Sequence, residues 1–267
     1  MKKETEGVKT EKRLLHFSRA GSIMKAIKEK EGTDMKYLYE THCHTSVMSQ
    51  CSQLAPQQMT ELYLANGYTG VIVTEHFLNG NTWLNYNEYK NASYEDRVKR
   101  FCEGYGEVAR VANASGLDTF FSLEYSYNGT DVLIYGMDEA KLLAFPEILT
   151  LGPNELCKQL KGTEYLAAQA HPYRVDWYIP YTRIFDGVEG MEVYNACRND
   201  LCNGLAEYYA GACALVRTAG SDIHRASQPV LGGMAFDEKL TSVQDFIRLV
   251  REGKGEIVKK ENVYKEA

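Results

Sequence analysis

Strand-like and helix-like segments alternate along this sequence from Met35 onward, and this alternation limits the possible folds more than any other feature. Short apolar runs are expected to form strands at 37–40, 70–74, 119–124, 131–135, 165–169, 190–194, 215–219 and, more briefly, 233–236. Longer runs predict helices at 56–66, 94–114, 153–161, 200–210 and 243–252. Repeated strand–helix units predict an α/β fold with a mostly parallel sheet or a barrel. No linker rich in Pro, Gly or Ser interrupts the pattern, so a single domain is expected.

The composition is that of a folded globular protein. The chain has 267 residues, of which 44% are hydrophobic and 25% charged. No apolar run approaches the ~20 residues that a membrane helix needs, and the N-terminal residues lack the apolar stretch of a secretory signal. We therefore expect a cytoplasmic protein with no membrane partner. The seven cysteines contain no CxxC pair, which favours reduced thiols over disulfides.

The charge is unevenly distributed along the chain. The net charge is −6, but residues 1–34 carry +3, so the remaining residues carry −9. An acidic body repels phosphate backbones, and general nucleic-acid binding is therefore not expected. Residues 1–34 are interpreted as a charged extension, either a peripheral helix that includes a basic stretch at 14–28 or a disordered segment. Residues 35–267 are interpreted as the folded domain.

Five of the six histidines end or closely follow predicted strands. They are His42, His44, His76, His171 and His224. Active sites of α/β barrels and open α/β sheets form at the C-terminal ends of the strands, so these histidines are expected to converge. In extended backbone, residues two apart point to the same side, so His42 and His44 can bind one metal while Cys43 faces away.

Carboxylates occupy similar positions. Glu124 ends an apolar strand, and the Asn-Gly pair at 128–129 predicts a tight hairpin turn after it. A two-residue turn places Asp131 opposite Ser126, on the face that carries Glu124. Two acids that converge on apolar strands need a cation.

Polar residues follow three later strands. Asp222 and His224 share one face in the segment GSDIH, and such a pair can bind a metal. Arg174 follows His171 closely enough to meet a substrate anion. Asn195 ends another strand, where it is placed to orient a ligand or a phosphate.

The order of these motifs resembles the PHP family, named for polymerase and histidinol phosphatase. The sequence has HxH, an apolar strand ending in Glu-His, an apolar strand ending in Glu, then AHP and GSDxH, between about Tyr39 and His224. The resemblance implies a distorted (β/α)7 barrel that binds two or three divalent ions (Zn, Mn or Fe). It also implies a phosphoesterase that acts on a small phosphorylated metabolite or nucleotide by attack of a metal-bound hydroxide.

The resemblance also implies a set of metal ligands: His42, His44, His76, Glu124, Asp131, His171, Asp222 and His224. Glu124 would bridge two metals. The family often has another histidine a few residues after this glutamate, and Asp131 is the candidate here. His76 and His224 match a third metal position. The acid or histidine that usually completes it is missing from 46–51, where Cys51 is the only alternative, so a weak, substrate-assisted or empty third site is expected.

The same resemblance assigns roles in catalysis. Glu124, Asp222 and His224 are the expected catalytic residues, with His224 as a proton donor. Substrate contacts are expected from Arg174, Arg198, Arg225 and Asn195. Two alternatives remain open: a non-catalytic metal-binding PHP module, and a metal-dependent hydrolase of C–N or C–O bonds, in which Arg174 would matter little.

Overall fold

The computed structural model describes residues 36–179 and 183–265. The chain divides into two compact units, Met1–Lys36 and Tyr37–Ala267. The expected extension at 1–34, with its basic stretch at 14–28, lies outside the described residues. No helix in the described part has the length and apolarity required to cross a membrane.

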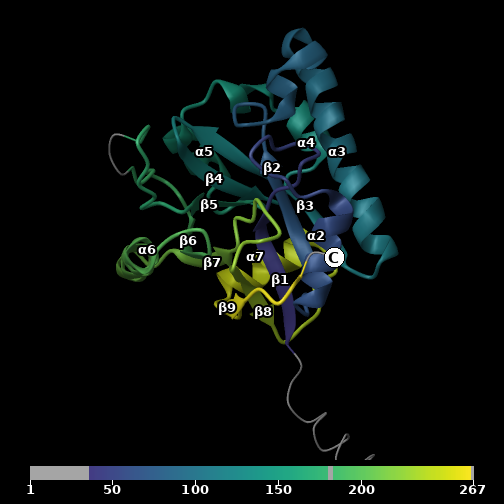
Figure 1. Ribbon diagram of the computed structural model, residues 1–267. Coiled ribbons are helices and arrows are strands. Elements are labelled where there is room, and N and C mark those ends of the chain that lie inside the picture. Colours follow the sequence, from purple (N-terminus) through teal and green to yellow (C-terminus); the bar gives the residue numbers. More distant parts are fainter. Residues whose placement is uncertain (1–35, 180–182, 266–267) are drawn as a thin grey trace, which may run out of the picture. The chain divides into compact units, whose positions relative to one another are not determined.

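The described residues of the second unit build one mixed sheet of nine strands that is nearly closed into a barrel (Figure 1). The strands are β1 (Tyr37–Cys43), β2 (Gly70–His76), β3 (Asp118–Tyr127), β4 (Thr130–Tyr135), β5 (Leu166–Ala170), β6 (Gly190–Asn195), β7 (Val216–Gly220), β8 (Val230–Phe236) and β9 (Glu256–Glu261). Their order in the sheet is β7-β6-β5-β4-β3-β2-β1-β8-β9. The strands expected from the sequence are all present, and β9 was not expected.

The expectation of a mostly parallel sheet is wrong. Strands β1, β2 and β3 are parallel, as are β5, β6 and β7, but β4 is antiparallel to both of its neighbours, and so is β8. The first reversal follows from the predicted turn, because a two-residue turn joins only antiparallel strands. Asn128 and Gly129 have φ of 50° and 78°, and Ser126 pairs with Asp131 as expected.

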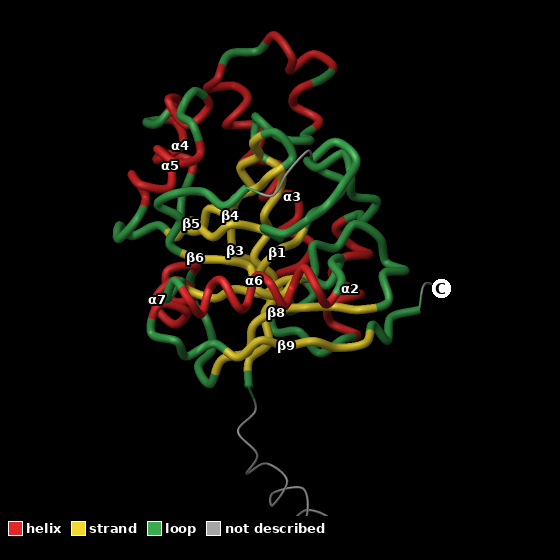
Figure 2. The backbone as a smooth tube through the Cα atoms, turned by 90° about the vertical axis from the view of Figure 1, so that its left-hand side faces the viewer, coloured by secondary structure: helices red, strands yellow, loops and turns green. Residues whose placement is uncertain are grey.

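Helices lie around the strands (Figure 2). They are α2 (Pro56–Ala65), α3 (Tyr94–Ala114), α4 (Glu139–Leu143), α5 (Pro153–Leu160), α6 (Asp200–Ala212) and α7 (Val243–Arg251), with 3-10 turns η1 (Trp83–Asn85), η2 (Asn87–Asn91) and η3 (Pro146–Leu149). The side chains of Ser93, Asn199 and Ser242 accept hydrogen bonds from backbone N–H groups in the first turns of α3, α6 and α7. The five helices expected from the sequence begin where predicted and end within two residues of the prediction. The short α4 and the 3-10 turns were not expected.

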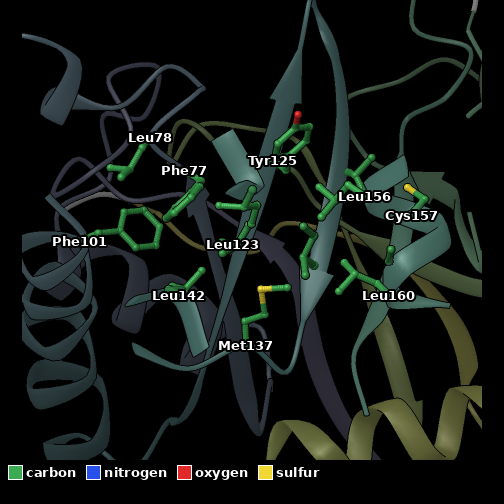
Figure 3. Close-up of a cluster of buried hydrophobic side chains, with 14 of the residues drawn as sticks. Phe77, Leu78, Phe101, Leu123, Tyr125, Met137, Leu142, Leu156, Cys157 and Leu160 are labelled. Carbon is green, nitrogen blue, oxygen red and sulfur yellow. The ribbon is translucent and has the colours of Figure 1, made fainter. Parts of the chain in front are cut away.

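The largest buried apolar cluster lies between the sheet and helices α3, α4 and α5 (Figure 3). Strand β3 contributes Leu123 and Tyr125, which pack with Phe101 of α3 and Leu156 of α5 in this cluster. Successive side chains of a strand point to opposite faces, so Glu124 between them points away from the cluster. The packing of β3 against the helices therefore determines the direction of the Glu124 carboxylate.

The sheet curls until β7 meets β1 and β8, and two glycines allow this contact. A Cβ atom on Gly220, the last residue of β7, would lie 2.4 Å from the Cβ of His42 in β1. A Cβ atom on Gly232 of β8 would lie 2.3 Å from the carbonyl oxygen of Gly220. Both distances are shorter than real Cβ contacts, so only glycine permits this approach.

Hydrogen bonds connect β7 and the residues that follow it to β1 and β8. The Thr41 hydroxyl donates to the Ala219 carbonyl at 2.8 Å, and the Asp222 N–H donates to the His42 carbonyl at 2.9 Å. On the β8 side, the Gly232 N–H donates to the Ser221 hydroxyl at 2.8 Å. These bonds place the residues that follow β7 beside the end of β1.

We expect the Gly232→Ala variant to be destabilised by about 1–3 kcal/mol, because the added methyl group must separate β8 from β7. Urea unfolding of the purified protein measures this change. Gly106→Ala in α3 is the matched control, since a Cβ there meets nothing within 4 Å. The control should be stabilised by roughly 0.5–1 kcal/mol, because alanine is a better helix former than glycine. A Gly232→Ala variant as stable as the wild type would contradict this account of the closure.

Candidate metal centre

All eight residues predicted as metal ligands meet at one edge of the sheet. Strand β1 supplies His42 and His44, at or just after its end, β2 ends in His76, and β3 carries Glu124. The antiparallel β4 begins at this edge, where it carries Asp131, while His171 follows β5, and Asp222 and His224 follow β7.

The Glu124 carboxylate lies in the middle of the histidines. Its Oε1 lies 3.3 Å from Nε2 of His42 and 3.6 Å from Nε2 of His171. Its Oε2 lies 3.3 Å from Nε2 of His44 and 2.8 Å from Nδ1 of His76. Both carboxylate oxygens are buried, and neither accepts a hydrogen bond from the described residues. A buried carboxylate without donors is costly unless a cation compensates it.

Asp222 and Asp131 complete the acidic part of the centre. Asp222 Oδ1 lies 3.6 Å from the Nε2 atoms of His42 and His44, and Asp131 Oδ2 lies 3.8 Å from Nε2 of His171. Four overlapping groups of three residues have ligand atoms that all lie within 4.8 Å of one another: His42–His44–Glu124, His42–His171–Asp222, His44–Asp222–His224 and His76–Glu124–Asp131. The shared members indicate one centre with room for more than one cation.

Two of the ligands have an unusual backbone. His171 has φ of 29° and Asp222 has φ of 51°, in the left-handed region that side chains other than glycine rarely adopt. His171 directly follows β5, and Asp222 lies two residues after the end of β7. Such strain is typical of functional sites, and here it turns both side chains toward the centre.

Glu192 of β6 determines how His42 presents its ring. The Glu192 carboxylate is buried, with Oε1 2.8 Å from His42 Nδ1. Its Oε2 accepts from the His171 N–H and from Asn195 Nδ2, both at 2.9 Å. Because Nδ1 donates its hydrogen to Glu192, the lone pair of His42 lies on Nε2 and faces the centre.

The Ser49 hydroxyl, which is hydrogen-bonded to Glu75, orients the ring of His44 in the same way. Ser49 Oγ donates to the buried Glu75 carboxylate at 2.5 Å, so it acts as an acceptor toward its other neighbours. It accepts from His44 Nδ1 at 3.2 Å and from the His76 N–H at 3.0 Å. The N–H and the hydroxyl of Thr45 also donate hydrogen bonds to the Glu75 carboxylate. His44 therefore also faces the centre with the lone pair of Nε2.

These two imidazoles provide a test of whether a cation fits. Their Nε2 atoms lie 3.2 Å apart, and each also faces Glu124. Lone pairs that face each other and a carboxylate repel unless a positive charge lies between them. Burial lowers the pKa of both rings, and the pKa of His44 lies well below its usual value. Glu192, Asp222 and Glu124 raise the pKa of His42 well above its usual value, so these carboxylates favour a positive charge at Nε2, which a bound cation would supply in place of a proton. The donor set therefore fits a divalent cation such as Zn, Mn or Fe.

A third buried carboxylate, Glu40, connects three elements behind the ligands. Its Oε1 accepts from the backbone N–H groups of His42, at 2.8 Å, and Ser221, at 2.9 Å. Its Oε2 accepts from the hydroxyl of Tyr63 in α2 at 2.8 Å. Burial raises the pKa of Glu40 to about 7, against the lowering effect of these donors.

The sequence motifs assign no function to Glu40, Glu75 and Glu192. Each stands in or at the end of an otherwise apolar strand and is completely or almost completely buried. A carboxylate in such a run, within three residues of a candidate ligand or of the end of its strand, is the signal that could have identified them.

A cavity of about 440 Å³ opens above the centre. The ligands His76, Glu124, Asp131, His171, Asp222 and His224 form its floor. Its outer wall includes Cys51, Asn79, Asn128, Arg174, Tyr178 and Arg198. A larger cavity of about 570 Å³ lies between residues 226–230 and 261–265, and none of the candidate ligands lines it.

Arg174 and Arg198 bring positive charge to this cavity. An Arg174 Nη atom lies 3.5 Å from Asp131, and an Arg198 Nη atom lies 3.4 Å from Asp222. The guanidinium of Arg174 also stacks over the Tyr178 ring at 5.3 Å. The Nε atoms of both arginines are buried and have no partner among the described residues.

The other two predicted substrate contacts do not line the cavity. Arg225 is exposed on the surface. Asn195 is completely buried, and its Nδ2 donates to Glu192 and, at 3.2 Å, to Asp222. The structure therefore places Asn195 behind the ligands, since its amide group is occupied by the two carboxylates.

In comparisons with known proteins, no family model and no curated protein matches this sequence. Solved structures match by fold. A two-domain protein from Bacteroides vulgatus that contains a predicted PHP-like metal-dependent phosphoesterase has a TM-score of 0.54 and 14% identity, over 84% of this chain and 65% of that chain. The chain thus spans less than two thirds of that protein.

Two further structures are less similar. A proposed metal-dependent phosphoesterase from Bifidobacterium adolescentis has a TM-score of 0.47 and 14% identity, over 70% of this chain and 87% of that chain. An amidohydrolase from Chromobacterium violaceum has a TM-score of 0.47 and 14% identity, over 81% of this chain and 96% of that chain. The expected resemblance to PHP-like proteins is confirmed at the level of the fold by the Bacteroides structure.

We expect Glu192→Ala to lower the free energy of unfolding by roughly 2–5 kcal/mol, because three buried donors lose their acceptor. Urea unfolding measures the loss. Glu261→Ala, an exposed carboxylate at the end of β9, is the control and should stay within about 0.5 kcal/mol of the wild type. Equal stability of the two variants would show that Glu192 does not support the centre.

Proposed function

We propose that this protein is a metal-dependent phosphoesterase that hydrolyses a small phosphorylated metabolite or nucleotide. The observation that carries the proposal is a cavity whose floor consists of histidines and carboxylates and whose wall presents Arg174 and Arg198. The histidines and carboxylates of the floor can bind divalent cations, and the two arginines of the wall can bind an anion. The proposal includes a PHP-type distorted (β/α)7 barrel over 35–267, with 1–34 as an extension.

The ligands divide between two principal cations in this proposal. His42, His44 and Asp222 would hold the first. His171 and Asp131 would hold the second, and Glu124 would bridge the two. When bound, such cations neutralise a phosphate dianion and lower the pKa of water to ~7.

The residues of the cavity would bind and orient the substrate. Arg174 and Arg198 would each donate hydrogen bonds to phosphate oxygens, in exchange for their long contacts with Asp131 and Asp222. Arg174 is already oriented by stacking on Tyr178. A fork of N–H donors on either side of the phosphate restricts its rotation and thereby favours in-line attack.

His224 would supply the proton that the leaving oxygen needs. Its Nδ1 lies 2.7 Å from the carbonyl oxygen of Asp222, which fixes the ring. Interactions with Cys197, Cys51 and Asp222 raise the pKa of His224 above its usual value, although burial alone would lower it. A protonated imidazole in the cavity floor can donate to an alkoxide as it leaves.

We expect the purified protein to carry at least two equivalents of a transition metal, and Glu124→Ala and Asp222→Ala to lose this metal together with hydrolysis. Turnover of an aryl phosphate with Mn or Zn supplied should fall by at least roughly 100-fold, since each carboxylate contacts several other ligands. Elemental analysis and circular dichroism accompany the assay. Glu261→Ala should retain both metal and activity. Full turnover in either ligand variant would refute the assignment.

We expect Arg174→Ala to lower kcat/KM for phosphomonoesters by roughly 10- to 100-fold without loss of metal, because a charge-assisted contact with phosphate disappears. Steady-state kinetics with phosphate esters and with C–N substrates measures the effect. Unchanged kinetics on phosphate esters, with turnover of a C–N or C–O substrate, would favour the alternative hydrolase instead.

A further inference from the structure

The segment that follows β5 forms two consecutive turns beside the cavity. The Arg174 N–H donates to the His171 carbonyl at 2.9 Å, which closes the first turn. Asp176 holds the second turn, because its Oδ1 accepts from the Trp177 N–H at 2.8 Å and its carbonyl accepts from the Ile179 N–H at 2.9 Å. Short-range hydrogen bonds therefore hold the backbone of this segment.

The Tyr178 ring forms part of the outer wall of the cavity, and two neighbours fix its position. The Arg174 guanidinium stacks over the ring at 5.3 Å. A Cβ atom on Gly129, in the hairpin between β3 and β4, would lie 2.9 Å from Cε2 of the ring, so the glycine lets the ring pack closely against the hairpin. The Tyr178 side chain is nevertheless 41% exposed, which leaves part of it available to a ligand.

Trp177 extends this aromatic surface beyond the cavity wall. The centroid of its ring lies 5.6 Å from that of the Tyr178 ring, at an interplanar angle of 84°. Trp177 is 94% exposed, the largest value among the large hydrophobic side chains that the structure describes. The other tryptophan, Trp83, is 43% exposed, and its Nε1 donates to the Ser46 carbonyl at 3.2 Å. Trp177 therefore offers nearly its whole side chain to a ligand.

The position of this surface suggests what it binds. Ligand cavities commonly combine aromatic surface with a few polar groups that orient the ligand. Here the polar groups are Arg174 and Arg198, which face the cavity and suit a phosphate, and the aromatic surface begins at Tyr178 on the same wall. An aromatic side chain gains the most from a planar partner, on which it can stack.

We propose that Trp177 and Tyr178 select substrates whose phosphate is attached to a planar aromatic group, either an aryl ring on the ester oxygen or a base linked through a sugar. The inference rests on the proposed phosphoesterase activity and names its substrate class. The phosphate lies between Arg174 and Arg198, and the remainder of the ester extends outward past Tyr178 to the indole of Trp177. Trp177 is thus a specificity-determining residue that takes no part in the chemical step.

Paired substrates test this selection in the full chain with Mn or Zn supplied. Phenyl phosphate and cyclohexyl phosphate are similar in size, but only phenyl phosphate has a planar ring. We expect Trp177→Ala to lower the ratio of kcat/KM for phenyl phosphate to that for cyclohexyl phosphate by at least roughly 5-fold, mainly through KM. Because the variant's ratio is compared with the wild-type ratio, the different reactivities of the two leaving groups cancel.

Two variants serve as controls for this ratio. Trp177→Phe retains an aromatic ring and should restore most of the wild-type ratio. Tyr208→Ala removes a side chain of α6 that is 78% exposed and does not line the cavity, so the ratio should stay unchanged. The same comparison with AMP identifies the source of the ring. A loss with AMP alone assigns the surface to a base, and a loss with phenyl phosphate alone assigns it to an aryl leaving group.

Binding of phenylphosphonate provides a readout without turnover, because its P–C bond is not a phosphate ester. In a Trp83→Phe background, Trp177 is the only tryptophan of the chain. We expect phenylphosphonate to change its fluorescence and methylphosphonate to leave it unchanged. Trp177→Ala should weaken phenylphosphonate binding by at least roughly 5-fold in calorimetry. The fluorescence measurement retains Trp177, so a failure of Trp177→Ala to fold does not prevent the test.

The outcomes separate this inference from the phosphoesterase proposal. Unchanged ratios for both phenyl phosphate and AMP in Trp177→Ala, or phenylphosphonate binding without a change in Trp177 fluorescence, would overturn the inference. Hydrolysis of phosphate esters in that case would leave the phosphoesterase proposal standing. Binding of phenylphosphonate that depends on Trp177, in a protein that hydrolyses no phosphate ester, would support the aromatic site and reject the phosphoesterase.

Discussion

The close contact of β7 with β1 and β8 is the constraint on which the rest of the structure depends. Five strands separate β1, which carries His42, from β7, which Asp222 follows, in the sheet order. The two residues become neighbours only because the sheet curls until Gly220 meets His42. A side chain on Gly220 or Gly232 would occupy space already filled by backbone atoms. Without this contact, the ligands of β1 and those that follow β7 would be separated by the width of the sheet.

The carboxylates behind the ligands show how the fold prepares a cation centre. Glu192 and Glu75, the latter through Ser49, direct the hydrogens of His42 and His44 away from the centre. Glu40 binds the backbone at the ends of β1 and β7. Each buried carboxylate has a large desolvation cost, which donors offset in these three but not in Glu124. The negative charge of Glu124 therefore lies at the point where four of the five histidines of the centre meet.

The cavity combines this acidic floor with two arginines, and this combination would allow an acidic protein to bind the anionic substrate that we propose. Arg174 and Arg198 contact Asp131 and Asp222 at 3.5 and 3.4 Å, which is longer than the usual charged hydrogen bond. Cations on the floor would neutralise these acids and leave both guanidinium groups for a phosphate.

The sequence by itself determined the local features of this protein. Periodicity placed the main strands and helices, the Asn-Gly pair placed Asp131 opposite Ser126, and the positions of the histidines and acids at strand ends identified all eight residues that meet at the centre. Local rules suffice there, because strand alternation, turn geometry and helix capping depend on residues only a few positions apart. Other features depend on residues that are distant in the sequence, and only the tertiary structure decided them. They are the antiparallel β8, the closure at Gly220, the burial of Asn195 and the exposure of Arg225. It also placed Cys51 in the lining of the cavity that includes His76 and His224, because hydrogen bonds from its loop to residues near the ends of other strands hold it there.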